Sequence, residues 1–245
     1  MNMANWDPNA ALGIFFPDAN LARCIRATAK THVEYIDVLK CYQCKISDLT
    51  GIEYLKNLMV LDLHFNEISS GQELTKLGRL QELHLGLNAC SDIRFLGSMT
   101  SLRNLTLFDN EIEDCSAVAH LTNLEVLHLR FNDIEDISPL AHLHQLKEMS
   151  ISANLVDDLS PLSGLQNLEI VNFYKNYVQD ISALQYSRKL KEVYLGQNPI
   201  RDASVLFEMP DLIECKYEGT QIPDNQKAYI DQLIGANKKR LGLPV

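Results

Sequence analysis

Apolar and polar residues alternate along this chain in a pattern that returns every 22 residues. One period reads Leu-x-Leu-x-x-Asn-x-Ile, as at Leu61, Leu63, Asn66 and Ile68. The alternation predicts a short strand, the asparagine predicts a turn, and the apolar residues beyond it predict a short helical or 3₁₀ segment. The asparagine column is Asn66, Asn88, Asn110, Asn132, Asn154, Asn176 and Asn198.

The pattern extends by one period at each end, with Cys44 and Thr220 at the asparagine position, which gives nine units. The repeated Leu-x-Leu-x-x-Asn-x-Ile pattern resembles that of leucine-rich-repeat proteins. A single unit cannot bury its apolar face, whereas stacked units build a continuous core. We therefore predict an α/β fold, an open leucine-rich-repeat solenoid with a concave parallel sheet. Each column asparagine is expected to bond buried backbone groups of neighbouring turns.

Both ends of an open solenoid need a cover. Residues 18–30 place apolar side chains on one helical face and predict an N-terminal cap, and a second cap helix is predicted from Pro223. The positive charges at 238–240 would interact favourably with the dipole at the C-terminal end of that helix. The alternative interpretation is that these charges form part of a binding site. The predicted parts are an N-terminal segment with its helical cap (1–37), the repeats (38–222) and a C-terminal helical cap (223–245).

An aspartate column lies four residues after the asparagine column. A calcium-binding ladder is one interpretation, and a turn and cap network on the outer side is the other. Serine follows two residues later in several units, and Ser138-Pro139 looks like a helix cap followed by proline, so we favour the network. The column is Asp48, Asp92, Asp114, Asp136, Asp158, Asp180 and Asp202, broken by Ser70.

Composition and charge narrow the class of protein. A hydrophobic share of 46% with 22% charged residues describes a globular chain. The net charge of −10 disfavours phosphate contacts, so no nucleic-acid partner is expected. No early apolar run approaches the ~20 residues that span a bilayer, so we expect no membrane insertion. No Lys or Arg precedes Arg23, so we expect a cytoplasmic chain, or one exported without a cleavable signal peptide. The oligomeric state is left open.

We expect the six cysteines to be free thiols that form neither disulfides nor metal ligands. Five of them, Cys41, Cys44, Cys90, Cys115 and Cys215, occupy core positions of the repeat, so we expect all six to stay reduced, in a reducing compartment. The Cys41-x-x-Cys44 motif lacks the second pair that a zinc site would want. No phosphate-binding loop, metalloprotease motif or nucleophile elbow is recognised, so no cofactor or metal is expected.

Asp62, His84 and Thr106 fall in one column on successive predicted strands, about 4.8 Å apart, like an acid, base and hydroxyl relay. They would project from an open surface without a water-excluding pocket or oxyanion donors. We therefore expect the chain to have no enzymatic activity. The nearby histidines also form no compact set of metal ligands.

The segment Ile14-Phe15-Phe16-Pro17-Asp18-Ala19-Asn20-Leu21 precedes a predicted helix, and later units read Asp136-Ile137-Ser138-Pro139-Leu140. Together they resemble the internalin group of bacterial leucine-rich-repeat proteins over most of the chain. The resemblance implies protein recognition by the concave face, without catalysis. No signal peptide, immunoglobulin-like segment or wall-anchoring tail is recognised, so a cytosolic binder or exported effector is expected. The unit length is also similar to eukaryotic phosphatase-regulating repeats.

Residues two and four positions before each column asparagine should face the concave side, because the leucines between them point inward. These positions do not repeat, so the fold does not dictate them. Aromatic residues and Arg are typical interface anchors, and we expect Phe108, Arg130 and Tyr174 to form one patch near the middle of the arc. The candidate protein-binding residues are Tyr42, His64, His84, Phe108, His128, Arg130, Phe131, Asn172, Tyr174 and Tyr194.

The sequence thus predicts a non-enzymatic module that recognises a protein partner on its concave face. A bacterial effector or host-protein binder is one form, and an acidic immunity-type inhibitor of a basic toxin is another. The alternative is a regulatory subunit that docks on an enzyme such as a protein phosphatase.

Overall fold

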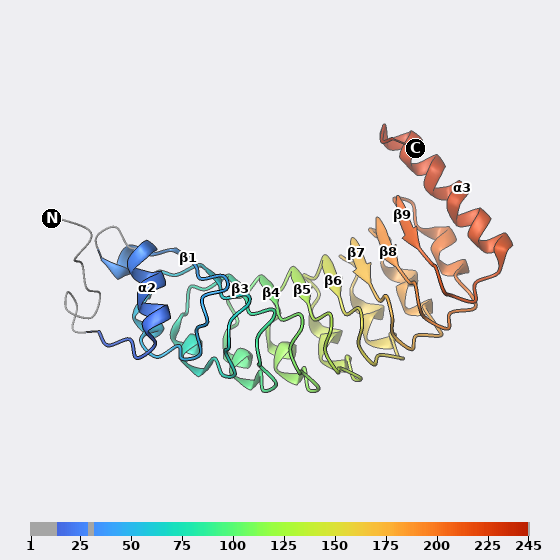
Figure 1. The fold of residues 1–245 in the computed structure, drawn as a ribbon. Coiled ribbons are helices and arrows are strands. Elements are labelled where there is room, and N and C mark those ends of the chain that lie inside the picture. Colours follow the sequence, from blue (N-terminus) through green and yellow to red (C-terminus); the bar gives the residue numbers. More distant parts are fainter. Residues whose placement is uncertain (1–13, 29–31, 245) are drawn as a thin grey trace.

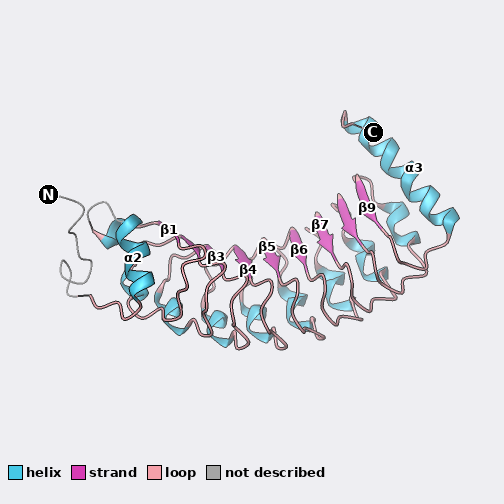
Figure 2. Cartoon of the chain, in the orientation of Figure 1, coloured by secondary structure: helices cyan, strands magenta, loops and turns pink. Residues whose placement is uncertain are grey.

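The computed structural model describes residues 14–28 and 32–244 of the 245-residue chain. The first 13 residues of the predicted N-terminal segment lie outside this range, as do residues 29–31, which include the last two positions of the predicted cap helix. The described residues form an arc with strands along its concave side and short helices along its convex side (Figure 1). One helix covers each end of the arc (Figure 2).

In the described residues the concave side is one parallel sheet of nine strands, whose order follows the sequence. Each strand pairs with the next in a register of one repeat, so Leu61 lies beside Leu83. Equivalent side chains therefore form rows across the sheet, which confirms the predicted solenoid. The strands are Val38–Lys40 (β1), Val60–Asp62 (β2), Glu82–His84 (β3), Asn104–Thr106 (β4), Val126–His128 (β5), Glu148–Ser150 (β6), Ile170–Asn172 (β7), Glu192–Tyr194 (β8) and Glu214–Lys216 (β9).

The convex segments are 3₁₀ helices of three to five residues. Such short connections suit the i to i+3 bonding of a 3₁₀ helix, since one tight turn already returns the chain to the next strand. Their apolar residues, such as Leu140, are buried against the sheet. The helices are Val33–Tyr35 (η2), Ile52–Tyr54 (η3), Gln72–Lys76 (η4), Arg94–Ser98 (η5), Ser116–His120 (η6), Ser138–His142 (η7), Ser160–Gly164 (η8), Ser182–Tyr186 (η9) and Ser204–Glu208 (η10).

The aspartate column holds the start of these helices. The backbone N–H of Ser138 donates to Asp136 Oδ1 at 2.7 Å, and η7 begins at Ser138 itself. The prediction that serine caps the helix was therefore wrong, because the carboxylate two residues earlier reaches the free N–H groups. Across the part of the chain that the structure describes, no three His, Cys, Asp or Glu side chains are grouped to hold a metal ion.

The asparagine column joins each unit to the one before it. Asn66 Nδ2 donates to the carbonyls of Leu63 and Cys41, both at 2.8 Å, and Asn66 Oδ1 accepts from Ile46 N–H at 3.0 Å. The first unit has no earlier repeat to bond, which explains why Cys44 can replace asparagine there. In the last unit, Thr220 Oγ1 donates to the Tyr217 carbonyl instead.

Two α-helices cover the ends of the core. Helix α2 (Ala19–Thr28) buries Leu21 and Ile25, and α3 (Asp224–Leu241) buries Ile230. Arg240 Nη2 donates to the Pro210 carbonyl at 2.7 Å, so this charge serves to dock the helix. Among the described residues, no helix combines the length and apolarity that crossing a membrane requires.

A disulfide joins Cys24 of α2 to Cys41, which directly follows β1. The expectation that all six cysteines remain thiols was therefore wrong. The repeat places Cys41 in the core, but only the docking of α2 brings Cys24 to it. Cys44, Cys90, Cys115 and Cys215 are free thiols. Burial raises the pKa of three of them, Cys90, Cys115 and Cys215, to about 12, so they are poor nucleophiles at neutral pH.

Candidate protein-binding surface

The concave face is built from the strand residues that lie between the buried leucines. The row four positions before the asparagines runs from Asp62 through His84, Thr106 and His128 on neighbouring strands. A second row, two positions before the asparagines, lies beside it along the turn edge of the sheet. Residues far apart in the sequence are therefore direct neighbours on this face.

The central feature of the second row is a stack of His64, Phe108 and Arg130. The Arg130 guanidinium carbon lies 4.4 Å from the centroid of the Phe108 ring, within cation–π range. The other contact of this ring is with His64, at a centroid distance of 5.1 Å. Gly86 lies between them in the row, and a Cβ there would lie only 2.5 Å from Phe108 Cε1. The missing side chain of Gly86 thus lets Phe108 lean across the end of β3 toward His64.

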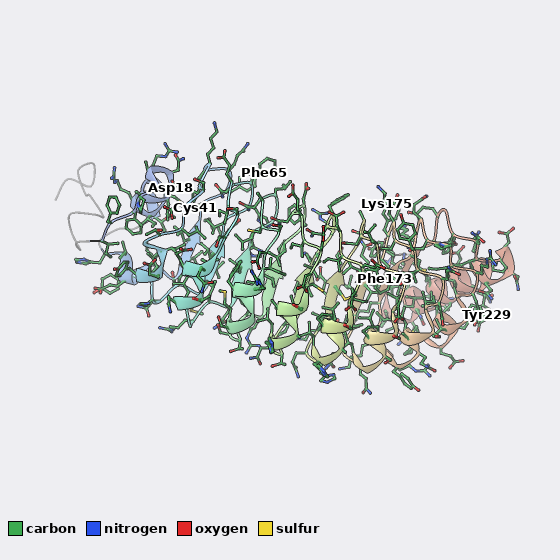
Figure 3. The ribbon with its side chains drawn as sticks, turned by 90° about the horizontal axis from the view of Figure 1, so that it is seen from below. Asp18, Cys41, Phe65, Phe173, Lys175 and Tyr229 are labelled. Atoms are coloured by element: carbon green, nitrogen blue, oxygen red, sulfur yellow. A yellow bond between two sulfur atoms is a disulfide. The ribbon has the colours of Figure 1, made fainter. Side chains whose placement is uncertain are left out.

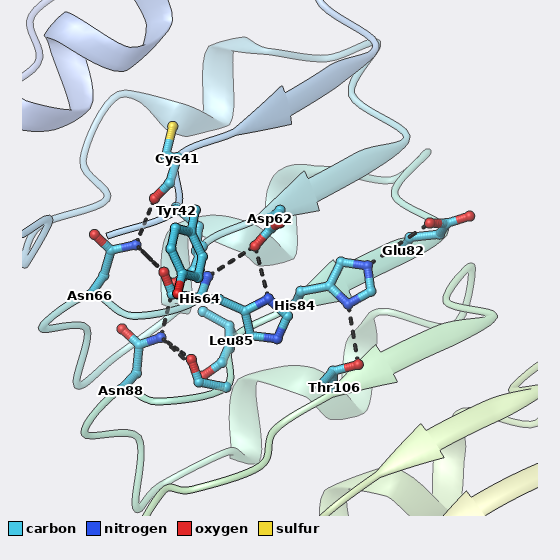
Figure 4. A network of polar contacts seen from close by, with 12 residues as sticks. Cys41, Tyr42, Asp62, His64, Asn66, Glu82, His84, Leu85, Asn88 and Thr106 are labelled. Carbon is cyan, nitrogen blue, oxygen red and sulfur yellow. Dashed lines mark hydrogen bonds and ion pairs between the residues drawn. The ribbon is translucent and has the colours of Figure 1, made fainter. Parts of the chain in front are cut away.

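His64 and His84 form a compact group with their polar neighbours (Figure 4). His64 stacks on His84 at 5.3 Å, and His64 Nδ1 lies 2.9 Å from Asp62 Oδ1. His84 Nδ1 lies 3.1 Å from Thr106 Oγ1. Burial lowers the pKa of His84, and the neighbouring His64 lowers it further, although the carboxylates of Asp62 and Glu82 oppose this. His84 is therefore neutral at physiological pH.

The acid, base and hydroxyl relay that the sequence suggested is not assembled. Asp62 bonds His64 through both the backbone N–H and the ring nitrogen, at 3.1 and 2.9 Å, and not His84. His84 faces Thr106, and its other ring nitrogen lies 3.9 Å from Glu82 Oε2. Asp62 and His64 are two residues apart in the same repeat, so the carboxylate pairs locally and not with His84 on the next strand.

Beside the stack, the concave face carries an open hollow of about 420 Å³. Phe108 and Arg130 form one wall and Tyr194 the other, with Ser150 between them. Tyr194 is held by a bond from its hydroxyl to Glu192 Oε2 at 2.8 Å, and its pKa is raised by burial and by that carboxylate. On the other side, His128 Nε2 lies 2.9 Å from Glu148 Oε1.

Of the remaining candidate residues, Phe131 adjoins the stack, because the Arg130 guanidinium carbon lies 6.0 Å from the centroid of its ring. Tyr42 is exposed near Phe65, with ring centroids 5.8 Å apart. Tyr174 is exposed, and its backbone N–H donates to Asn172 Oδ1 at 3.0 Å. Phe131 lies in the turn at the end of its strand, not on the sheet itself.

Two of the three residues expected to form one patch are in contact, because the Arg130 guanidinium lies over the Phe108 ring. Ser152 lies in the row between Arg130 and Tyr174, and its side chain is buried. That Tyr174 joins the other two in one binding patch stays a prediction.

Sequence reasoning missed two residues that shape this surface. Gly86 lies two positions before Asn88, in a row of candidate positions, and a glycine among large side chains is a recognisable signal for a close approach. Phe65 directly precedes Asn66 and is not among the candidate residues. Its contact with Tyr42 follows from the register of β1 and β2.

Comparison with known proteins agrees with this geometry. The family described as leucine-rich repeat region matches residues 28–216. A crystal structure of internalin C2 from Listeria monocytogenes shares 32% identity at a TM-score of 0.82, over 86% of this chain and 96% of that one. Internalin F from the same organism shares 26% identity at a TM-score of 0.67, over 93% of this chain and 81% of that one.

A plant peptide hormone receptor, RGFR1 in complex with RGF2, shares the fold alone, with 20% identity and a TM-score of 0.57 over 69% of this chain and 34% of that one. No curated protein gives a significant match. The chain belongs to the internalin-type bacterial leucine-rich-repeat proteins, a class of protein-interaction modules.

Proposed function

We propose that this chain is a non-enzymatic module that binds a protein partner across the middle of its concave face. The observation that carries the proposal is the stack of His64, Phe108 and Arg130 over Gly86. The solenoid core is already buried beneath these side chains, so folding does not require an aromatic ring there. Aromatic residues and Arg beside a hollow are the usual anchors of protein interfaces.

We further propose that the chain acts outside a reducing compartment, as an exported binder. The disulfide between Cys24 and Cys41 supports this location over the cytoplasm, because disulfides persist in oxidising surroundings. An antibody against the chain, applied to separated cytosolic and exported fractions, tests this location. Presence of the chain in the cytosol alone would contradict the proposed export.

Variants of the concave face test the binding site. A partner captured on the full chain from native extract should bind Phe108→Ala and Tyr174→Ala at least about tenfold more weakly, because each variant removes a large anchor. The matched control is Asp136→Ala on the convex side, which should bind as the unchanged chain does. Melting temperatures of all variants show whether the fold is kept. Equal binding by the three variants would rule out a concave site.

The identity of the captured partner then distinguishes the forms of this function. A host surface or signalling protein supports the effector form, a basic toxin supports the inhibitor form, and a phosphatase supports a regulatory subunit. Turnover of a hydrolase substrate panel that is lost in His84→Ala would contradict the non-enzymatic proposal.

A further inference from the structure

One buried nitrogen on the concave face lacks a hydrogen-bond partner. Within residues 14–28 and 32–244, His64 Nε2 is the buried side-chain nitrogen or oxygen atom for which no partner is present. Proteins pair the large majority of such atoms, so the exception points to a role for this ring. The next residue, Phe65, is exposed at the turn edge of the solenoid, on the same side as Lys175 (Figure 3). The unpartnered nitrogen is thus buried, yet close to solvent.

The other ring nitrogen fixes the protonation form of His64. Nδ1 lies 2.9 Å from Asp62 Oδ1 (Figure 4). An ionised carboxylate can only accept a hydrogen bond, so Nδ1 carries the proton and Nε2 of the neutral ring holds a lone pair. The ring stacks on His84 at a centroid distance of 5.3 Å and contacts Phe108 at 5.1 Å. An uncharged ring is therefore what this packing requires.

A second proton on His64 conflicts with this packing. It would bind Nε2 and create a buried N–H group that no acceptor faces. A buried donor on a charged ring costs more free energy than a buried lone pair on a neutral one. A Cβ on Gly86 would lie 2.8 Å from His64 Cδ2 and 2.5 Å from Phe108 Cε1, so both rings lie directly over Gly86. The charged ring must therefore turn outward to reach water.

The charges around His64 favour a proton on the ring without resolving that conflict. Asp62 favours the charged ring, but it accepts from Nδ1 in both states and leaves Nε2 without an acceptor. Arg130, whose guanidinium carbon lies 4.4 Å from the centroid of the Phe108 ring, adds a positive charge at that same ring. Strand β4 contributes only uncharged side chains, such as Thr106. The other charged or titratable side chains nearby are Lys40 and Tyr42 from the β1 repeat, Glu82 and His84 from β3, and His128 from β5.

We propose that the stack of His64, Phe108 and Arg130 is a pH-sensitive element of the concave face. At neutral pH the uncharged His64 ring supports Phe108, and the anchor is assembled. In acid the protonated His64 ring turns toward water at the turn edge, and Phe108 and Arg130 lose their support. The partner is therefore bound at neutral pH and released in acid. This release rests on the proposed function, whereas the rearrangement of the stack does not.

Nuclear magnetic resonance of the full chain tests the rearrangement without a partner. At about pH 7.5 the nitrogen-15 shifts of His64 should show a proton on Nδ1 alone, with a nuclear Overhauser effect between the His64 and Phe108 rings. At about pH 5.5, below the ordinary histidine pKa of about 6.5, both nitrogens should be protonated and this effect should be lost.

A glycine variant reproduces the acid form at neutral pH. Gly86→Ala should lack the ring-to-ring effect at both pH values, because its Cβ would lie 2.5 Å from Phe108 Cε1 and displaces that ring. Gly97→Ala on η5 is the matched control, since its Cβ would meet no atom closer than 3.5 Å, and it should keep the effect at neutral pH.

Several spectra would overturn the inference. A bare Nδ1 at about pH 7.5, a His64 ring still uncharged at about pH 5.5, or a ring-to-ring effect that persists after His64 is protonated would each do so. Unchanged amide shifts in β7, β8 and β9 show that the acid change is local. Global unfolding over the same range would also contradict the inference.

A partner captured on the full chain from native extract tests the release. The unchanged chain should bind it roughly fivefold or more weakly at about pH 5.5 than at about pH 7.5, because Phe108 is no longer held in place. His64→Phe keeps a ring that cannot take a proton, so it should lose much less affinity in acid. His120→Phe on the convex helix η6 is the matched control and should respond as the unchanged chain does. Equal losses by the unchanged chain and His64→Phe would overturn the inference. Binding that never depends on Phe108, together with the expected spectra, would contradict the proposed function alone.

Discussion

Column asparagines hold adjacent repeats together because a single amide can donate and accept at once. Asn132 Nδ2 donates to the carbonyls of Leu107 and Leu129, at 3.0 and 2.9 Å. Its Oδ1 accepts from Ile112 N–H at 3.1 Å. These backbone groups lie in the turn between two units, where no ladder partner is available. Loss of the amide leaves them buried without a partner.

We therefore expect Asn132→Ala to lower the free energy of unfolding by about 1 to 3 kcal/mol, the usual cost of unsatisfied buried polar groups. Urea denaturation followed by circular dichroism measures this. Asn225→Ala is the matched control, because Asn225 is exposed in the first turn of α3, and it should change stability by less than about 0.5 kcal/mol. Equal effects of the two variants would contradict the role of the column.

A pH dependence follows from His84, whose folded pKa is held below its ordinary value of 6.5, mainly by burial and then by His64. Between the folded pKa of His84 and its ordinary value of 6.5, the unfolded chain binds more protons than the folded chain does. The free energy of unfolding therefore falls as the pH drops below 6.5 and through the folded pKa. His84→Gln should reduce this acid loss, and His120→Gln on η6 should leave it unchanged. Urea midpoints across this range measure both, and identical pH profiles for the two variants would refute the assignment.

At the scale of the secondary-structure elements, α2 is tied to the first repeat by polar and covalent contacts. Asp18 Oδ2 accepts from the N–H of Ser47 at 2.8 Å, and the Cys24–Cys41 disulfide adds a covalent link to β1. The N–H bonds also lower the pKa of Asp18, although burial opposes them. The cap is thus fixed to the first repeat by polar and covalent contacts besides its apolar face.

Reduction of the disulfide should lower the free energy of unfolding by about 2 to 4 kcal/mol, because it closes a loop across a separation of 17 residues. The urea midpoint with and without reductant measures this effect. Cys24→Ala should have the lower midpoint already and should not respond to reductant. Labelling of all six cysteines in the unreduced, denatured chain would show that no disulfide forms.

Across the whole molecule, each unit contacts only its neighbours, so local damage should spread only a short distance. Ile230 of α3 is fully buried at the C-terminal end of the core. Ile230→Ala should cost about 2 to 5 kcal/mol locally. Hydrogen exchange should then accelerate in β8 and β9 far more than in β2 and β3. Uniform acceleration along the arc would indicate one cooperative unit instead.

Local sequence determined the parts of this protein that repeat. The spacing of leucines and asparagines specified the strands, the turns and the rows of the concave face, because these depend on residues within one period. The same pattern placed His84, Phe108 and Arg130 on that face. The buried positions carry apolar residues in every unit, so the core residues can be recognised from the sequence of a single period.

Only the tertiary structure decided which of these side chains meet. Phe108 contacts His64 because Gly86 leaves space on the strand between them, and His64 stacks on His84 of the neighbouring strand. Cys24 reaches Cys41 only when α2 docks on the first repeat. The physical reason is common to all three: a period fixes backbone positions, whereas side-chain contacts depend on the volume of residues in adjacent strands and on elements outside the repeat.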